Sequence, residues 1–210
     1  MNKEKIVKAF KSIYFSFIWL ALLLLVLDFI SKWVVQNNVT EPITVIDGFF
    51  WISLTHNLGA AFSIGDDGSI EMRVIWIAVS VIMSIGLIFY YVKNYKKLNV
   101  WYRLSLSMMI AGALGNMIDR MFYWKALVGF DGVIDWLSFK LFGVWYFPSF
   151  NIADSALVIG VIILIVLLIK ESVQEAIKKG KQGAYVLPPT EYEKKIEEEK
   201  NKKDNSNKDE

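Results

Sequence analysis

The sequence predicts an integral membrane protein that is mainly α-helical, with four transmembrane helices and a small extracytoplasmic β-element. The chain has 210 residues and is 55% hydrophobic, which is more than a soluble domain of this size usually contains. Four apolar stretches approach the roughly 20 residues that a helix needs to cross a bilayer. Two segments between them are rich in β-branched and aromatic residues, which is typical of short strands.

The four apolar stretches define the expected helices. The first follows a lysine-bearing start and resembles a secretory signal. It has no small-residue cleavage site, so we expect a retained helix. After the fourth stretch the chain becomes charged with both signs, and residues 176–210 are expected to form a disordered cytoplasmic tail. The predicted helices cover residues 12–35, 74–92, 104–122 and 150–169.

Lysine and arginine predict the orientation, because they concentrate in cytoplasmic loops. The connection 36–70 has no basic residue, and 121–149 has only Lys125 and Lys140. Both termini are therefore expected in the cytoplasm and both long loops outside. The basic residues of the other side are Lys3, Lys5, Lys8, Lys11, Lys93, Lys96, Lys97, Arg103, Lys170, Lys178, Lys179 and Lys181.

The two long loops are expected to build the β-element. Residues 43–56 read as two strands joined by a turn at Asp47 and Gly48, and residues 132–150 have a similar composition. Their tryptophans and tyrosines suit the lipid headgroup region, so we expect the strands to lie on the outer membrane surface.

Several classes of chemistry are excluded or disfavoured by composition. The chain has no cysteine, which excludes disulfides, thiolate nucleophiles and cysteine metal sites. His56 is the only histidine. We expect it in a turn or at the surface, and a Ser-His-Asp or histidine-based metal site is not expected. The net charge of +2 indicates no nucleic-acid partner.

Polar residues gather at the outer ends of three predicted helices. Each has an ordinary explanation: Asp28 can pair with Lys32, Asp119 can neutralise Arg120, and Asp154 can cap its helix. As a set they favour a functional site, because charge inside a membrane segment is costly. Two close carboxylates can share one proton, which suits aspartic peptide hydrolysis without a cofactor.

Five sequence blocks, in order, carry a family resemblance. They are DFISK (28–32), NLGAAFS (57–63), GNMIDR (115–120), VID (133–135) and FNIADS (150–155). Together they resemble lipoprotein signal peptidase, or signal peptidase II, over roughly residues 10–175. The resemblance implies a bacterial inner-membrane aspartic endopeptidase that needs no metal. It would cut diacylglyceryl-modified prolipoproteins before the lipidated cysteine, in contact with membrane lipid, and globomycin-type antibiotics would inhibit it.

The resemblance also implies roles for individual residues. Asp135 and Asp154 match the catalytic pair, and residues 1–175 would form the peptidase domain. Ser31 replaces the usual threonine, and the stretch 121–132 is longer than usual, which makes Asp131 a rival for Asp135 and suggests a gating loop. The residues expected to bind substrate or support the site are Asp28, Lys32, Asn57, Gly59, Asn116, Asp119, Arg120, Asn151, Ala153 and Ser155.

Other classes of protein remain as alternatives. A small solute transporter would place the charges along a path, yet these charges stay at one membrane face. A metal-dependent membrane transferase would use Asp119, Asp131 and Asp135, although their spacing does not match that of phospholipid transferases. A structural membrane protein is the third alternative.

Overall fold

The computed structural model describes residues 14–59, 69–122, 124–125, 129–130, 132–182, 191–192 and 195–196. The chain divides into two compact units, Met1–Leu168 and Ile169–Glu210. Every predicted site residue belongs to the first unit, so this unit alone contains the candidate site.

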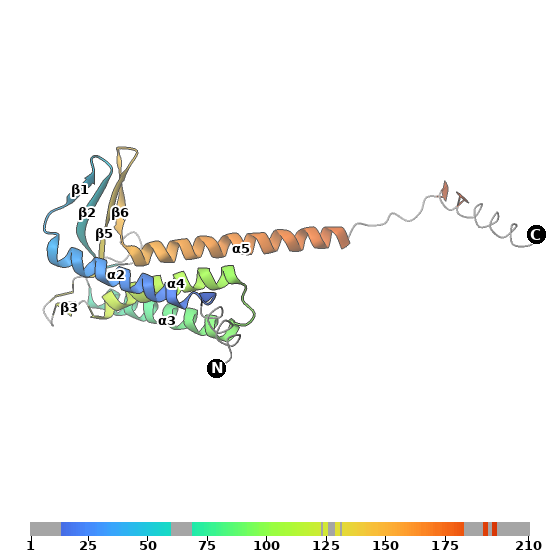
Figure 1. The fold of residues 1–210 in the computed structure, drawn as a ribbon, viewed down its shortest axis with the longest axis horizontal. Helices are drawn as coiled ribbons and strands as arrows, with labels where there is room; N and C mark the ends of the chain where they lie inside the picture. The colour runs from blue at the N-terminus through green and yellow to red at the C-terminus, as the bar shows by residue number, and fades with distance from the viewer. Residues whose placement is uncertain are drawn as a thin grey trace, which may run out of the picture. The chain divides into compact units, whose positions relative to one another are not determined.

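Four long helices dominate the described residues: α2 (Ile18–Asn38), α3 (Ile70–Asn94), α4 (Val100–Phe122) and α5 (Ile152–Gln182). Figure 1 shows α2, α3 and α4 lying side by side. Three segments among the described residues are long and apolar enough to cross a membrane, within α2, α3 and α5. The expectation of a mainly helical membrane protein is confirmed.

Helix α4 is the most polar of the four because it packs inside the bundle. It contacts both α2 and α3. Ser105, Ser107, Asn116 and Asp119 are buried on it. Small residues let it approach α5 closely, as is common between membrane helices. A Cβ on Gly160 would lie 2.8 Å from the Ser105 carbonyl oxygen.

The predicted β-element is a four-stranded antiparallel sheet. It comprises β1 (Ile43–Ile46), β2 (Phe50–Asn57), β5 (Val133–Leu141) and β6 (Trp145–Phe150), in the order β1-β2-β5-β6. The expected turn at Gly48 is confirmed, with a φ of 68° that glycine tolerates well. A separate short ladder joins β3 (Trp124–Lys125) to β4 (Gly129–Phe130).

The sheet stands at the end of the bundle where α2 finishes and α5 begins (Figure 1). Its strand β5 contacts α2 and α4, and Val133, Ile134 and Asp135 at its start are buried. Strand β6 leads directly into α5. The sheet therefore delivers Asp135 to the first turn of α5, where Asp154 lies.

Helix α5 continues to Gln182, past the boundary predicted at residue 175. Most of the predicted tail lies outside the described residues, so the division into 1–175 and 176–210 stays a prediction.

Candidate active site

A reciprocal cap formed by Asn151 and Asp154 begins helix α5. The Asn151 side-chain oxygen accepts the backbone N–H of Asp154 at 2.8 Å, and Asp154 Oδ2 accepts the backbone N–H of Asn151 at 3.0 Å. Such a capping box satisfies two N–H groups that the helix leaves unpaired. The expectation that Asp154 caps its helix is confirmed, and the cap also holds its carboxylate in one place.

Asn116 connects this cap to the rest of the cluster. Its Nδ2 donates to Asp154 Oδ1 at 2.6 Å. Its Oδ1 accepts from Asn151 Nδ2 at 3.1 Å and from Lys32 Nζ at 3.2 Å. Because both ends of the amide are used, the orientation of Asn116 is determined by its partners.

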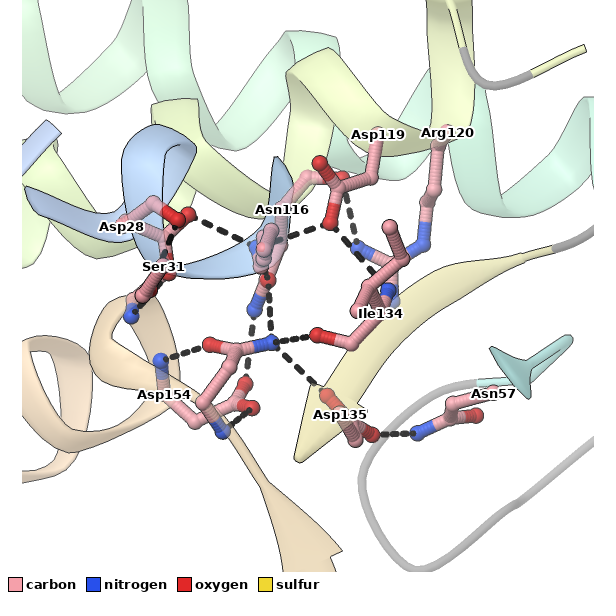
Figure 2. A network of polar contacts seen from close by, with 12 residues as sticks. Asp28, Ser31, Asn57, Asn116, Asp119, Arg120, Ile134, Asp135 and Asp154 are labelled. Carbon is pink, nitrogen blue, oxygen red and sulfur yellow. Dashed lines mark hydrogen bonds and ion pairs between the residues drawn. The ribbon is translucent and has the colours of Figure 1, made fainter. Parts of the chain in front are cut away.

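Asp135 lies beside the same cap, on strand β5. Its Oδ1 accepts from Asn151 Nδ2 at 2.7 Å, and its Oδ2 accepts from Asn57 Nδ2 at 3.1 Å. Burial, and next the negative charge of Asp154, raises the pKa of Asp135 to about 7, although the donors Asn57 and Asn151 favour the carboxylate. Asn151 thus touches both aspartates of the predicted pair. Figure 2 shows Asp135, Asp154 and Asn57 within this network of polar contacts.

Lys32 forms the centre of a buried charge triad with Asp28 and Asp119. Its Nζ lies 2.7 Å from Asp28 Oδ2 and 2.7 Å from Asp119 Oδ2, and its side chain is 0% exposed. The predicted pair of Asp28 with Lys32 is confirmed. Neutralisation of Arg120 was one ordinary explanation for Asp119, whose close ion pair in the structure is with Lys32. The physical reason is geometric, since Lys32 from α2 reaches between the two carboxylates.

Asp28 also contacts helix α5 directly. Its Oδ1 accepts the backbone N–H of Ala153 at 2.9 Å, so a side chain of α2 satisfies a second N–H in the first turn of α5. Gly115 on α4 leaves room for this contact. A Cβ at Gly115 would lie 2.8 Å from Asp28 Oδ2 and 2.8 Å from the Ala153 Cβ. These three residues join α2, α4 and α5 next to Asp154.

Arg120 extends from the end of α4 toward the loop that follows β2. Its guanidinium donates to the Gly59 carbonyl oxygen at 3.1 Å and to Ser80 Oγ at 3.3 Å. The Gly59 N–H in turn donates to Asn57 Oδ1 at 3.0 Å. Arg120 therefore supports the segment that presents Asn57 to Asp135.

A pocket of about 430 Å³ opens beside the two aspartates. Asp135, Asp154 and Arg120 contribute polar groups to its lining, and strand β6 and the first turns of α5 contribute apolar ones. The pocket thus places two carboxylates in the wall of a partly apolar space. Its other lining residues are Asn57, Asn116, Val133, Phe147, Pro148, Ser149, Phe150, Ser155, Leu157, Val158 and Ile159.

The structure brings together every residue that the sequence predicted for the site, within this network or directly beside it. Ser155 belongs to it through its hydroxyl, which donates to the Asn151 carbonyl oxygen at 2.9 Å.

The rival Asp131 lies outside the described residues. His56 was expected in a turn or at the surface. It does not lie in a turn, because β2 continues through it to Asn57, and its side chain is partly exposed. Within the described ranges, no group of three His, Cys, Asp or Glu side chains could hold a metal ion.

Sequence reasoning missed Ile134 and Ser80. The Ile134 N–H donates to Asp119 at 3.3 Å and its carbonyl accepts from Asn151 at 3.2 Å. Both contacts use the backbone, so the isoleucine side chain gives no signal of them. Ser80 supports Arg120 from a helix that looked uniformly apolar.

Comparison with known proteins agrees with this arrangement. The family model described as signal peptidase (SPase) II matches residues 20–170. A lipoprotein signal peptidase of Enterococcus faecalis is 41% identical over 165 residues, covering 77% of this chain and 91% of the relative. One of Fusobacterium nucleatum is 39% identical over 153 residues, covering 71% and 84%. A solved bacterial membrane enzyme is 30% identical, with a TM-score of 0.61, and covers 77% of this chain and 89% of its own.

Apolar helices that can cross a bilayer, together with these matches, define a multi-pass membrane protease. The chain belongs to the signal peptidase II family. It is a hydrolase that removes signal peptides from prolipoproteins.

Proposed function

We propose that Asp135 and Asp154 are the catalytic pair of an aspartic endopeptidase, which cuts diacylglyceryl-modified prolipoproteins before the lipidated cysteine. The observation that carries the proposal is the shared contact with Asn151, which holds one oxygen of each carboxylate at the same pocket. Asp135 is buried and Asp154 is partly buried, and both hydrogen-bond to the same residue. Two carboxylates held in this way favour sharing a single proton.

The pair supplies both halves of the acid–base chemistry. Asp154, at the positive end of α5, acts as the base that takes a proton from the attacking water. Asp135 holds the shared proton and gives it to the carbonyl oxygen as the tetrahedral intermediate forms. Collapse of that intermediate breaks the C–N bond, and a proton passes to the leaving amine of the cysteine. The hydroxyl group of the water thereby becomes part of the new carboxyl group, and its proton ends on the new amine.

The neighbouring residues position the reactants. Asn116 and Asn151 hold Asp154, and Asn57 holds Asp135, so both carboxylates are in place before substrate arrives. Holding the scissile bond against an already positioned pair contributes a large part of the rate in such enzymes. Phe147, Val158 and the other apolar lining residues suit the signal peptide and the acyl chains.

We further propose four membrane spans, with both termini cytoplasmic and the site at the outer face of the inner membrane. Helix α4 has 23 residues, which is about 34 Å and enough to cross the hydrocarbon core. Its polarity is explained by its buried position between α2 and α3. The asymmetric lysine and arginine distribution supports the orientation. Globomycin-type inhibitors would occupy the same pocket.

The rate of cleavage is expected to fall as pH rises through about 7, which gives the pH profile an alkaline limb. The active pair carries one proton, so activity falls as pH rises through the pKa at which that proton leaves, and the pKa of Asp135 is raised to about 7. The Asn57 amide favours the carboxylate of Asp135, and its removal in Asn57→Leu should therefore move the limb to higher pH. The measurement is kcat/KM against pH in an uncharged detergent. A limb that moves downward or stays in place in Asn57→Leu contradicts the assignment.

The direct test of the function compares two substrates. Purified full-length protein in detergent, with EDTA present, is expected to cleave a diacylglyceryl-modified prolipoprotein. The same prolipoprotein without the lipid is the matched control, and it should be cleaved far more slowly. Inhibition by EDTA would contradict the metal-free aspartic mechanism. Failure to cleave the lipidated substrate in several detergents would contradict the proposed substrate.

A further inference from the structure

Three serine hydroxyls form a hydrogen-bonded row across the sheet. Ser138 on the central strand β5 lies 2.6 Å from Ser53 on β2 and 2.7 Å from Ser149 on β6, oxygen to oxygen. We call these three residues the serine clasp. Each pair is separated by less than the usual O–H···O distance limit of about 3.0 Å, so both contacts are well-formed hydrogen bonds.

The clasp coincides with two irregularities of strand pairing. Between the pairs Ile52–Leu137 and Thr55–Asp135, two residues of β2 face a single residue of β5. Between the pairs Leu137–Phe150 and Phe139–Phe147, two residues of β6 face Ser138 alone. These are the features of β-bulges, which interrupt the backbone ladder and redirect the strand, often beside active sites. Ser53 lies in the first bulge, and Ser149 lies in the second.

The second bulge forms part of the pocket wall. Phe147, Pro148, Ser149 and Phe150 all line the pocket. Pro148 has no N–H to donate to a ladder, so a bulge on an edge strand suits it. Two residues after Ser149 comes Asn151, which contacts both Asp135 and Asp154. The position of β6 at the bulge therefore affects both the pocket wall and the approach to the catalytic pair.

We propose that Ser53, Ser138 and Ser149 are positioning residues for the proteolytic reaction, which set the affinity for substrate by holding the bulged β6 wall against the central strand. The hydroxyl row replaces the ladder bonds that the two bulges remove. It touches neither reacting carboxylate, so its loss should loosen the wall and leave the chemistry in place. The inference rests on the proposed function, since it concerns binding at that same pocket.

The test uses a matched pair of variants at the centre of the clasp. Ser138→Thr keeps the hydroxyl, whereas Ser138→Val has nearly the same shape and lacks it, and both residue types are favoured in strands. We expect Ser138→Val to raise KM about three- to tenfold, the effect of losing one or two ordinary hydrogen bonds. Its kcat should stay within about twofold of wild type, and Ser138→Thr should restore KM.

Ser53→Ala gives an independent check, because Ser53 is not among the residues that line the pocket. It should raise KM in the same direction, and backbone amide exchange at residues 149–151 should become faster in both Ser53→Ala and Ser138→Val. Exchange needs no substrate, so it separates failure of the clasp from failure of the proposed function. If the wild-type protein cleaves the substrate and Ser138→Val and Ser138→Thr have equal KM values, the inference is overturned. Loss of thermal stability alone, with KM unchanged, would do the same.

Discussion

Replacing Asp135 by asparagine is expected to lower the rate of cleavage by about 10³-fold or more, because the pair loses its shared acid–base proton. Asp154→Asn should have an effect of similar size. The size of the side chain is preserved in both variants, so the fold should be retained. Steady-state cleavage of a lipidated prolipoprotein measures the loss, and thermal unfolding in detergent confirms that each variant is folded.

Both variants should also lose some stability, for the same structural reason. Both oxygens of Asp154 accept hydrogen bonds, one from Asn116 and one from the backbone of Asn151. Both oxygens of Asp135 likewise accept, one from Asn151 and one from Asn57. An asparagine at either position keeps one acceptor, but its NH₂ group faces the second donor. Each variant should therefore unfold at a lower temperature than wild type, with a loss of free energy of unfolding of about one buried hydrogen bond.

Asp47→Asn is the matched control for the loss of activity, since Asp47 lies exposed in the turn between β1 and β2. It should cleave as fast as wild type. Asp131→Asn tests the rival assignment, and it should also remain active. An inactive Asp131→Asn beside an active Asp135→Asn would show that the assignment across residues 121–132 is wrong, while the enzyme class would stand.

Much of the site could be predicted from the sequence because its members have visible chemistry. Charged and amide side chains stand out within apolar helices. The predicted alternation of helix direction puts the end of the first helix, the end of the third and the start of the fourth on one side of the membrane. The turn at Gly48 predicted the hairpin of residues 43–56, and the composition of residues 132–150 predicted β-structure there, which forms the second hairpin. The structure adds that these hairpins join into one sheet through the pairing of β2 with β5.

Contacts that use the backbone or an absent side chain could not be predicted. The bond from Asp28 to the Ala153 N–H depends on a gap at Gly115, and a glycine in a membrane helix has many explanations. The bulges that hold Ser53 and Ser149 arise from the pairing of distant strands. Helix α4 is difficult to recognise as a membrane span by hydropathy alone, because a helix surrounded by protein need not be apolar along its length.

Replacing Lys32 by methionine is expected to destabilise the protein by about 3–5 kcal/mol and to abolish cleavage. The change leaves the buried carboxylates of Asp28 and Asp119 without a counter-charge, where each had an ammonium at 2.7 Å. Asn116 also loses one of the two donors that orient its amide. Thermal unfolding in detergent measures the loss, and Lys93→Met, at an exposed lysine in the last turn of α3, is the matched control.

A triple variant separates the burial of charge from the loss of packing. Asp28→Asn, Lys32→Met and Asp119→Asn together contain no charge at the triad. The new asparagine oxygens can still accept the backbone N–H groups of Ala153 and Ile134, which the two aspartates accept in wild type. Because replacing a whole buried ion cluster costs much less than breaking it, the triple variant should recover more than half of the stability that Lys32→Met loses. A triple variant as unstable as Lys32→Met would show that the lysine stem, and not its charge, holds α2 against α4.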